Sequence, residues 1–251
     1  ISSIAWLVIA YSIAFSGTGA YVGDLGNLFL ANLSRDSMSG DIPESVFFMF
    51  QMTFAIITPA LIVGAYPERI KFSFVAVFSL LWVILIYAPV VHWIWAEGGW
   101  LYEMGVRDFA GGLVVHLTAG ITALVIAYFL GPRDGFPNSV QPPHNPGLTM
   151  MGACMLWVGW FGFNGGSELK LSNIDEANAV ARVFVNTNMS AAGGLIAALI
   201  AARLAFGKSD LTMALNGALA GLVSITADPL SPAPGLSVII GAIGGVIVVA
   251  S

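Results

Sequence analysis

The sequence DFAGGLVVHLTAGITALVIAYFL, residues 108–130, decides the class of fold. After Asp108 it carries no charge until Arg133, and a run of about 20 apolar residues is long enough to cross a bilayer as a helix. At about 1.5 Å rise per residue, an unbroken helix from Asp108 places His116 roughly 12 Å along its axis, near mid-membrane. The helical period also sets His116 on the smallest face of the segment, where another helix or a cavity can come close. That face carries Gly112, Ala119, Gly120 and Ala123.

The composition predicts an all-α integral membrane protein. Hydrophobic residues make up 57% of the 251 residues and charged residues 9%, whereas soluble domains contain about 25% charged residues. Eight apolar stretches should be helices, because their runs are continuous and do not alternate as strands of a β-barrel do. They cover residues 1–22, 43–66, 71–96, 108–131, 147–167, 180–206, 211–228 and 235–251. Glycine pairs at four-residue spacing permit close helix crossings, as at Gly162/Gly166, Gly217/Gly221 and Gly241/Gly245.

The two ends of the predicted spans differ in charge. Five of the nine Lys and Arg residues fall on the side opposite Asp108, which the positive-inside rule favours weakly as cytoplasmic. Eleven of the fourteen acidic residues fall on the side of Asp108, where they should attract cations. Cys154 is the only cysteine, so an internal disulfide and a multi-cysteine metal site are excluded. The start ISSIAWLVIAYSIAF has no initiator Met and no basic segment, and is expected to be a truncated start and not a signal peptide.

The middles of the predicted spans contain no Asp, Glu, Lys or Arg. This argues against a carboxylate-based proton pump or sodium-coupled carrier, and favours a path for a small neutral solute or a dehydrated cation. His116 is the exception at depth, although a core imidazole bonded to a neighbouring carbonyl is the alternative. His92 is expected to be structural, and His144 to be solvated in a proline-rich loop.

Aspartate and aromatic residues gather near the Asp108 side. Asp108 can cap a helix by accepting hydrogen bonds from the backbone N–H groups of the first turn, or stabilise a nearby cation through its charge, and both roles can hold together. The aromatic residues are Phe50, Phe54, Trp93, Trp95, Trp100, Trp160, Phe161 and Phe163. They can form an interfacial belt, or a cation–π site in which ring faces replace part of a cation's hydration shell. Ser167 could supply a hydroxyl to such a site.

Several motifs together resemble the ammonium transporter family (Amt/Mep/Rh). They are DFAGG with a histidine eight residues after the aspartate, FQMTFA at 50–55, VGAYPERIKFS at 63–73 and WFGFNGGS at 160–167. RVFVNTNMSAA and LNGALAGLVSITA agree with the same family, and the match extends over essentially the whole chain as one partial domain, 1–251.

The resemblance implies a role for each candidate residue. Trp95 and Phe54 would flank an outer ammonium recruitment site, with Ser167 as hydrogen-bond acceptor and Asp108 supporting it. Phe54 and Phe163 would be the ring pair that closes the pore below this site. Trp160 would line the pore below that pair. His116 would be the first of two pore histidines.

The resemblance further implies an eleven-helix bundle with inverted repeats, lacking here the first helix and the last helices, among them the second pore histidine. It implies a homotrimer in the plasma or inner membrane that moves ammonium or ammonia, without cofactor, metal or nucleic acid. An ammonium sensor with little flux and a cytoplasmic signalling partner is the alternative. A membrane enzyme is not expected, because the spans contain no paired acid and base, metal cluster or activated nucleophile.

Overall fold

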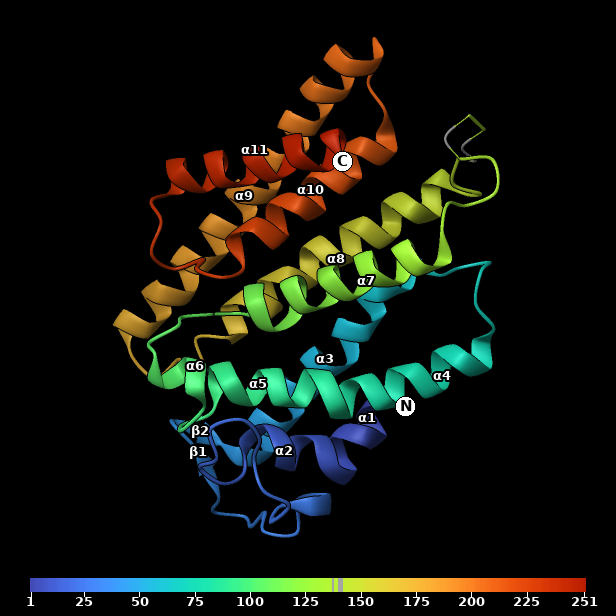
Figure 1. The fold of residues 1–251 in the computed structure, drawn as a ribbon. Helices are drawn as coiled ribbons and strands as arrows, with labels where there is room; N and C mark the ends of the chain where they lie inside the picture. The colour runs from blue at the N-terminus through green and yellow to red at the C-terminus, as the bar shows by residue number, and fades with distance from the viewer. Residues whose placement is uncertain (137, 140–141) are drawn as a thin grey trace. The chain divides into compact units, whose positions relative to one another are not determined.

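The computed structural model describes residues 1–136, 138–139 and 142–251, which are mainly helical as the sequence predicts (Figure 1). Five helical stretches in this part of the chain are long and apolar enough to cross a membrane. They are Glu44–Ala65, Phe72–Glu103, Gly112–Leu130, Pro146–Gly166 and Ile174–Phe206. Shorter apolar helices occupy the other three predicted positions, at Ser2–Phe15, Leu211–Ile225 and Pro234–Ala250.

The chain divides into two compact units. The first comprises Ile1–Asp108 and Leu113–Phe136, and the second comprises Phe109–Gly112 and Pro137–Ser251. A single domain over residues 1–251 stays a prediction.

The first unit is built from helices interrupted by wider π-helical turns. Its α-helices are α1 (Ser2–Ala5), α2 (Tyr11–Phe15), α3 (Glu44–Ile62), α4 (Phe72–Trp82), α5 (Ala88–Trp95), α6 (Trp100–Glu103) and α7 (Thr118–Leu130). The π-helical turns Trp6–Ala10 and Val83–Tyr87 join α1 to α2 and α4 to α5, and α7 continues from the π-helical segment Gly112–Leu117. Within this unit α2 packs against α5, and α3 packs against α7.

Two features of the first unit differ from the sequence-based expectation. The first helical stretch ends at Phe15, not at residue 22. A short antiparallel pair, β1 (Met38–Ser39) and β2 (Ile42–Pro43), precedes α3, with Gly40 at φ +57° in its turn. Strands of two residues are too short to show the alternation by which strands are recognised in a sequence.

Three prolines of this unit lie at the start of a helix or inside one. Pro43 and Glu44 begin α3 as N-cap and first-turn acid. Pro59 lies inside α3, where the hydroxyl of Thr58 donates to the carbonyl of Phe54 at 2.6 Å. Pro89 lies in the first turn of α5, directly after the π-helical turn, so the helix changes type where proline removes a backbone donor.

The second unit consists of four helices, α8 (Pro146–Gly166), α9 (Ile174–Phe206), α10 (Leu211–Ile225) and α11 (Pro234–Ala250). The helices α9, α10 and α11 pack against one another, and α8 packs against α9 and α10 (Figure 1). The start of α9 was expected at residue 180, but the helix begins at Ile174. The side chain of Asn173 caps it by accepting from the backbone N–H groups of Asp175 and Glu176, each at 3.0 Å. The acidic residues Asp175 and Glu176 therefore lie in the first turn of a helix.

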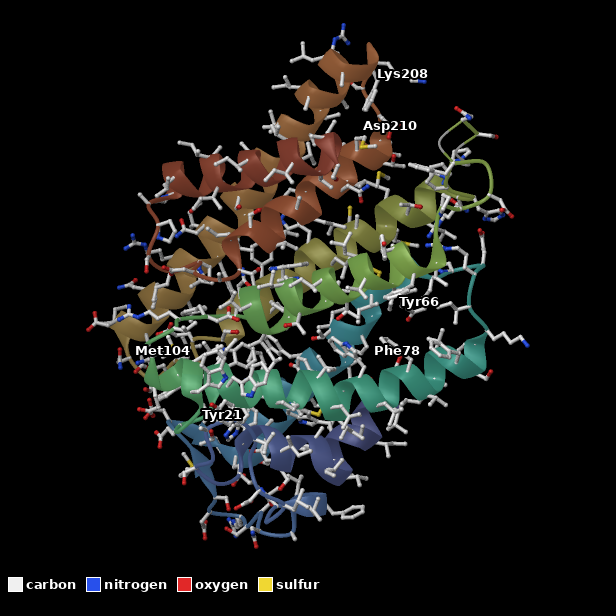
Figure 2. All side chains as sticks on the ribbon, in the orientation of Figure 1. Tyr21, Tyr66, Phe78, Met104, Lys208 and Asp210 are labelled. Atoms are coloured by element: carbon white, nitrogen blue, oxygen red, sulfur yellow. The ribbon has the colours of Figure 1, made fainter. Side chains whose placement is uncertain are left out.

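The helix α10 begins with a similar cap. Asp210 lies beside Lys208 in the turn from α9 to α10 (Figure 2). Its carboxylate accepts from the backbone N–H groups of Thr212 at 2.8 Å and Met213 at 3.0 Å, and from the Thr212 hydroxyl. Hydrogen bonds from Thr212 and Met213 lower the pKa of Asp210, because they stabilise the charged carboxylate.

Glycines allow the helices of the second unit to approach closely. A Cβ atom on Gly241 would lie 1.9 Å from the carbonyl oxygen of Ser190, and one on Gly221 would lie 2.3 Å from the same atom. The Ser190 hydroxyl donates to the carbonyl of Gly221 at 2.7 Å. The predicted close packing is thus confirmed for these residues. Gly162 makes no such crossing in the described part of the chain, because no heavy atom beyond the neighbouring backbone of its own helix lies within 4 Å of the place of its Cβ.

Candidate functional site

Three of the predicted site residues come together in the first unit. Trp95, the last residue of α5, donates from its indole Nε1 to the backbone carbonyl of Asp108 at 2.7 Å. The Phe54 ring from α3 meets the Trp95 ring edge to face, with centroids 5.7 Å apart and planes at 85°. Phe54 in turn contacts Phe50, at 5.0 Å between centroids. Phe54 is buried and Trp95 half-buried, and the choice between an interfacial belt and a cation–π site stays a prediction.

The carboxylate of Asp108 caps a helical segment that begins only at Gly112. Its Oδ2 accepts from the backbone N–H groups of Leu113 and Val114, both at 2.9 Å. These donors belong to the second and third residues of the segment that begins at Gly112, which are the donors an N-cap residue satisfies. The expected helix start at residue 108 is wrong, because residues 109–111 form a non-helical link. Asp108 is 7% exposed, so its charge is largely shielded from water.

His116 lies in the π-helical segment Gly112–Leu117 and is half-buried. The estimate of a 12 Å rise from Asp108 does not apply, since the chain between them is partly non-helical. Of the residues expected on the face of His116, Ala119 is buried, Gly112 and Ala123 are half-buried and Gly120 is exposed. The hydroxyl of Thr118 donates to the carbonyl of Leu113, five residues earlier, at 3.0 Å. Single π-helical turns of this kind are frequent at functional sites.

The other predicted site residues lie on α8 in the second unit. The rings of Trp160 and Phe163 have centroids 5.3 Å apart and planes at 40°. The hydroxyl of Ser167, the C-cap residue, donates to the carbonyl of Phe163 at 2.8 Å. With its hydrogen engaged there, the oxygen retains a lone pair with which to accept from a ligand. The pairings of Phe54 with Phe163 and of Trp95 with Ser167 join residues of the two units, and they stay predictions.

Sequence reasoning missed two polar groups beside these rings. The indole Nε1 of Trp160 donates to the hydroxyl of Thr226 at 2.9 Å, and both residues are buried. The amide of Asn164 donates to the hydroxyl of Thr187 at 3.0 Å, also in a buried position. The available signal was the placement of single polar residues in otherwise apolar helices, because buried polar groups require partners.

The remaining histidines agree with the sequence-based interpretation. His92 is buried, and its two ring nitrogens face the carbonyl oxygens of Ala14, at 3.0 Å, and Gly19. This supports a structural role. His144 is exposed in the loop before α8. Within the described ranges no group of three or more His, Cys, Asp or Glu residues is placed to hold a metal ion.

Comparison with protein families gives a match over the whole chain. The model of the Ammonium Transporter Family matches residues 1–251. The chain is 42% identical over 250 residues to a Bacillus subtilis protein named "Ammonium transporter". It is 37% identical over 252 residues to "Ammonium transporter Amt1" of Archaeoglobus fulgidus. Both alignments cover 98% of this chain but only 60% of the relative, so the chain spans about three fifths of these curated relatives.

Solved structures show the same likeness. The crystal structure of Candida albicans Mep2 superposes with a TM-score of 0.90 at 32% identity, covering 98% of this chain and 55% of that one. A structure named "Sensor Amt Protein" superposes with a TM-score of 0.89 at 32% identity, covering 100% of this chain and 62% of that one.

Proposed function

We propose, because this chain belongs to the ammonium transporter family, that the whole protein carries ammonium or ammonia across a membrane. Relatives named as ammonium transporters and the likeness to Mep2 support this activity. The family and the five spanning helices make the chain an integral membrane protein. We further propose the plasma or inner membrane as its location and a homotrimer as its assembly.

The observation that carries the proposal is the group formed by Trp95, Phe54 and Asp108. An aromatic ring attracts a cation through the negative face of its π-system, and a nearby carboxylate adds a favourable potential. Here the backbone of Asp108 holds the Trp95 indole at 2.7 Å, while its carboxylate holds the start of the next helix. The proposed recruitment site therefore combines a fixed ring with a fixed negative charge. Ser167 would add a hydrogen-bond acceptor.

The proposed passage below this site depends on loss of water. A charged ion is costly to transfer into an apolar environment, and desolvation favours the neutral form of an amine. Phe54 and Phe163 would form the ring pair that excludes water, and Trp160 would line the pore beneath them. The imidazole of His116 would then accept from or donate to the passing nitrogen, or take its proton.

An ammonium sensor is the second candidate. It is supported by the likeness to the structure named "Sensor Amt Protein", which covers all of this chain. In that case the same group of residues would bind the ion with little flux, and a cytoplasmic signalling partner would receive the signal. We do not propose an enzyme or a cofactor, since the relatives are named as transporters.

Uptake by proteoliposomes that contain the whole protein separates the two candidates. Saturable uptake of labelled methylammonium is the result expected of a transporter, and ion binding without uptake is the result expected of a sensor. His116→Ala should change the uptake rate or its selectivity while the oligomer on size-exclusion chromatography stays intact. Loss of the oligomer in this variant would instead indicate that His116 is a packing residue.

A further inference from the structure

Thr226 connects a buried ring to the end of a helix. It follows the last residue of α10, and its side chain is fully buried. The hydroxyl oxygen accepts from the indole Nε1 of Trp160 at 2.9 Å, while its hydrogen is donated to the carbonyl of Leu222 at 2.7 Å. A hydroxyl has one hydrogen and two lone pairs, so it can make both bonds at once. The direction of each bond is therefore determined.

The backbone at the same place holds a second segment. The backbone N–H of Ala110 donates to the carbonyl of Thr226 at 3.2 Å, and that of Phe109 donates to the carbonyl of Ala227 at 2.9 Å. Gly112 permits this close approach because it has no side chain: a Cβ atom there would lie 2.5 Å from the Cβ of Ala227. Thr226 thus bonds through its side chain to Trp160 and through its carbonyl to the link that follows Asp108.

We propose that Thr226 is a positioning residue that sets the orientation of the Trp160 ring in the conduction path. This inference rests on the proposed transport function. The Trp160 ring contacts the Phe163 ring, with centroids 5.3 Å apart, so a rotation of one ring displaces the other. Trp160 is 5% exposed, and a buried indole N–H that loses its acceptor must rotate, admit water or remain unpaired. Rotation changes the shape of the proposed pore and entry of water changes its dryness, whereas an unpaired N–H is costly and therefore favours one of these two outcomes.

The substitutions that test this role are closely matched in size. Thr226→Val keeps the branched shape and removes the acceptor, whereas Thr226→Ser keeps the hydroxyl. Ser224→Ala is the control on the same helix, because the exposed Ser224 hydroxyl also donates to a carbonyl four residues earlier, that of Ala220 at 2.7 Å. If Thr226→Val is not recovered from membranes, Thr226→Ala removes the same hydroxyl without a second methyl group.

Two measurements on the whole protein distinguish an effect on the position of the Trp160 ring from an effect on transport. The first is the ¹⁹F NMR signal of 5-fluorotryptophan, assigned to Trp160 by its loss in Trp160→Phe. The second is the concentration dependence of methylammonium uptake. Thr226→Val should shift the Trp160 signal and lower the maximal rate roughly tenfold, the size expected when a buried donor loses its partner. The half-saturation concentration should change little, because the proposed recruitment site is elsewhere.

Thr226→Ser should restore both the signal and the rate, and Ser224→Ala should alter neither. The proposal is overturned if Thr226→Val leaves the signal unmoved, if the signal moves while uptake is unchanged, or if Thr226→Ser behaves like Thr226→Val. Failure of the proposed function has a different signature, namely no uptake by the unaltered protein although the signal still shifts. That result would reduce Thr226 to a packing residue.

Discussion

Substitution of two glycines in one helical stretch should change stability in opposite directions. The first is Gly112, where an added Cβ would lie 2.5 Å from the Cβ of Ala227 and 2.8 Å from its Cα. Carbon atoms in contact are normally about 3.5–4.0 Å apart, so Gly112→Ala requires the backbone to move. The second is Gly120, where no described heavy atom lies within 4 Å of an added Cβ. Gly120→Ala is therefore the matched control.

The magnitudes follow from two opposing effects. Overpacking at a close contact costs about 1–3 kcal/mol, whereas alanine in a helix is favoured over glycine by about 0.5–1 kcal/mol. Gly112→Ala should therefore lose about 1 kcal/mol of stability, the difference between the midpoints of the two ranges. Gly120→Ala should gain about 0.5–1 kcal/mol, because only the helical preference acts there.

Thermal unfolding of the whole protein in detergent measures both effects. The shift is about 2–4 °C per kcal/mol for 150–250 residues and smaller for a longer protein, so Gly112→Ala should lower the apparent Tm by up to roughly 4 °C and Gly120→Ala should raise it by up to roughly 4 °C. A Gly112→Ala variant as stable as the unaltered protein would refute the argument from close approach. If both variants were destabilised by a similar amount, the cause would be the loss of a glycine in the helix and not the contact with Ala227.

Three further predictions concern charge and aromatic contacts. Asp108→Ala should lower the free energy of unfolding by about 1.5–3 kcal/mol for each of the two charge-assisted hydrogen bonds that it removes. Asp108→Asn should lower it less, because asparagine keeps an acceptor. Equal losses of Tm in both variants would contradict the capping role. Trp95→Leu should weaken apparent ammonium affinity by about 1–2 kcal/mol, seen as a higher half-saturation concentration for uptake, and an unchanged value would reject cation contact. Asp210 has a lower pKa in the folded protein than in the unfolded chain, where it is about 3.9. Its carboxylate therefore stabilises the folded protein at pH values above the unfolded pKa, and this stabilisation is lost as the pH falls through the folded pKa. Asp210→Ala should thus lower the apparent Tm at pH 7, and its difference from the unaltered protein should vanish in acid, whereas a constant difference down to the lowest pH would contradict this assignment.

The positions of the helices could be predicted because apolar run length and end signals are local properties of the sequence. Pro43 with Glu44 began a helix where expected, and the glycine pairs of α10 and α11 lie at close crossings. The π-helical turns could not be predicted, since the same apolar residues are compatible with α- and π-helical bonding. The face assigned to His116 stays a prediction, since its members range from the buried Ala119 to the exposed Gly120.

The candidate site was predicted unevenly for a related reason. Aromatic residues and Asp108 stand out in an apolar sequence, and three of them meet in the first unit. The acceptor of the Trp160 indole, by contrast, lies 66 residues away in the chain. No local pattern connects Trp160 with Thr226, and only the packing of α8 against α10 brings them together.

The length of α10 has a consequence for how its end is accommodated in lipid. Its 15 residues extend about 22 Å, less than the roughly 30 Å thickness of a bilayer's hydrocarbon layer. A helix of this length that starts at one surface at Asp210 ends well short of the other surface, and its last carbonyl groups face a region without water to solvate them. Peptide groups at such depth must be satisfied by protein. The residues that follow α10 supply part of this: the Thr226 hydroxyl and backbone N–H donate to the carbonyls of Leu222 and Val223. Phe109 and Ala110 then donate to the next two carbonyls, those of Ala227 and Thr226, so the DFAGG motif provides partners for the backbone just beyond the helix end.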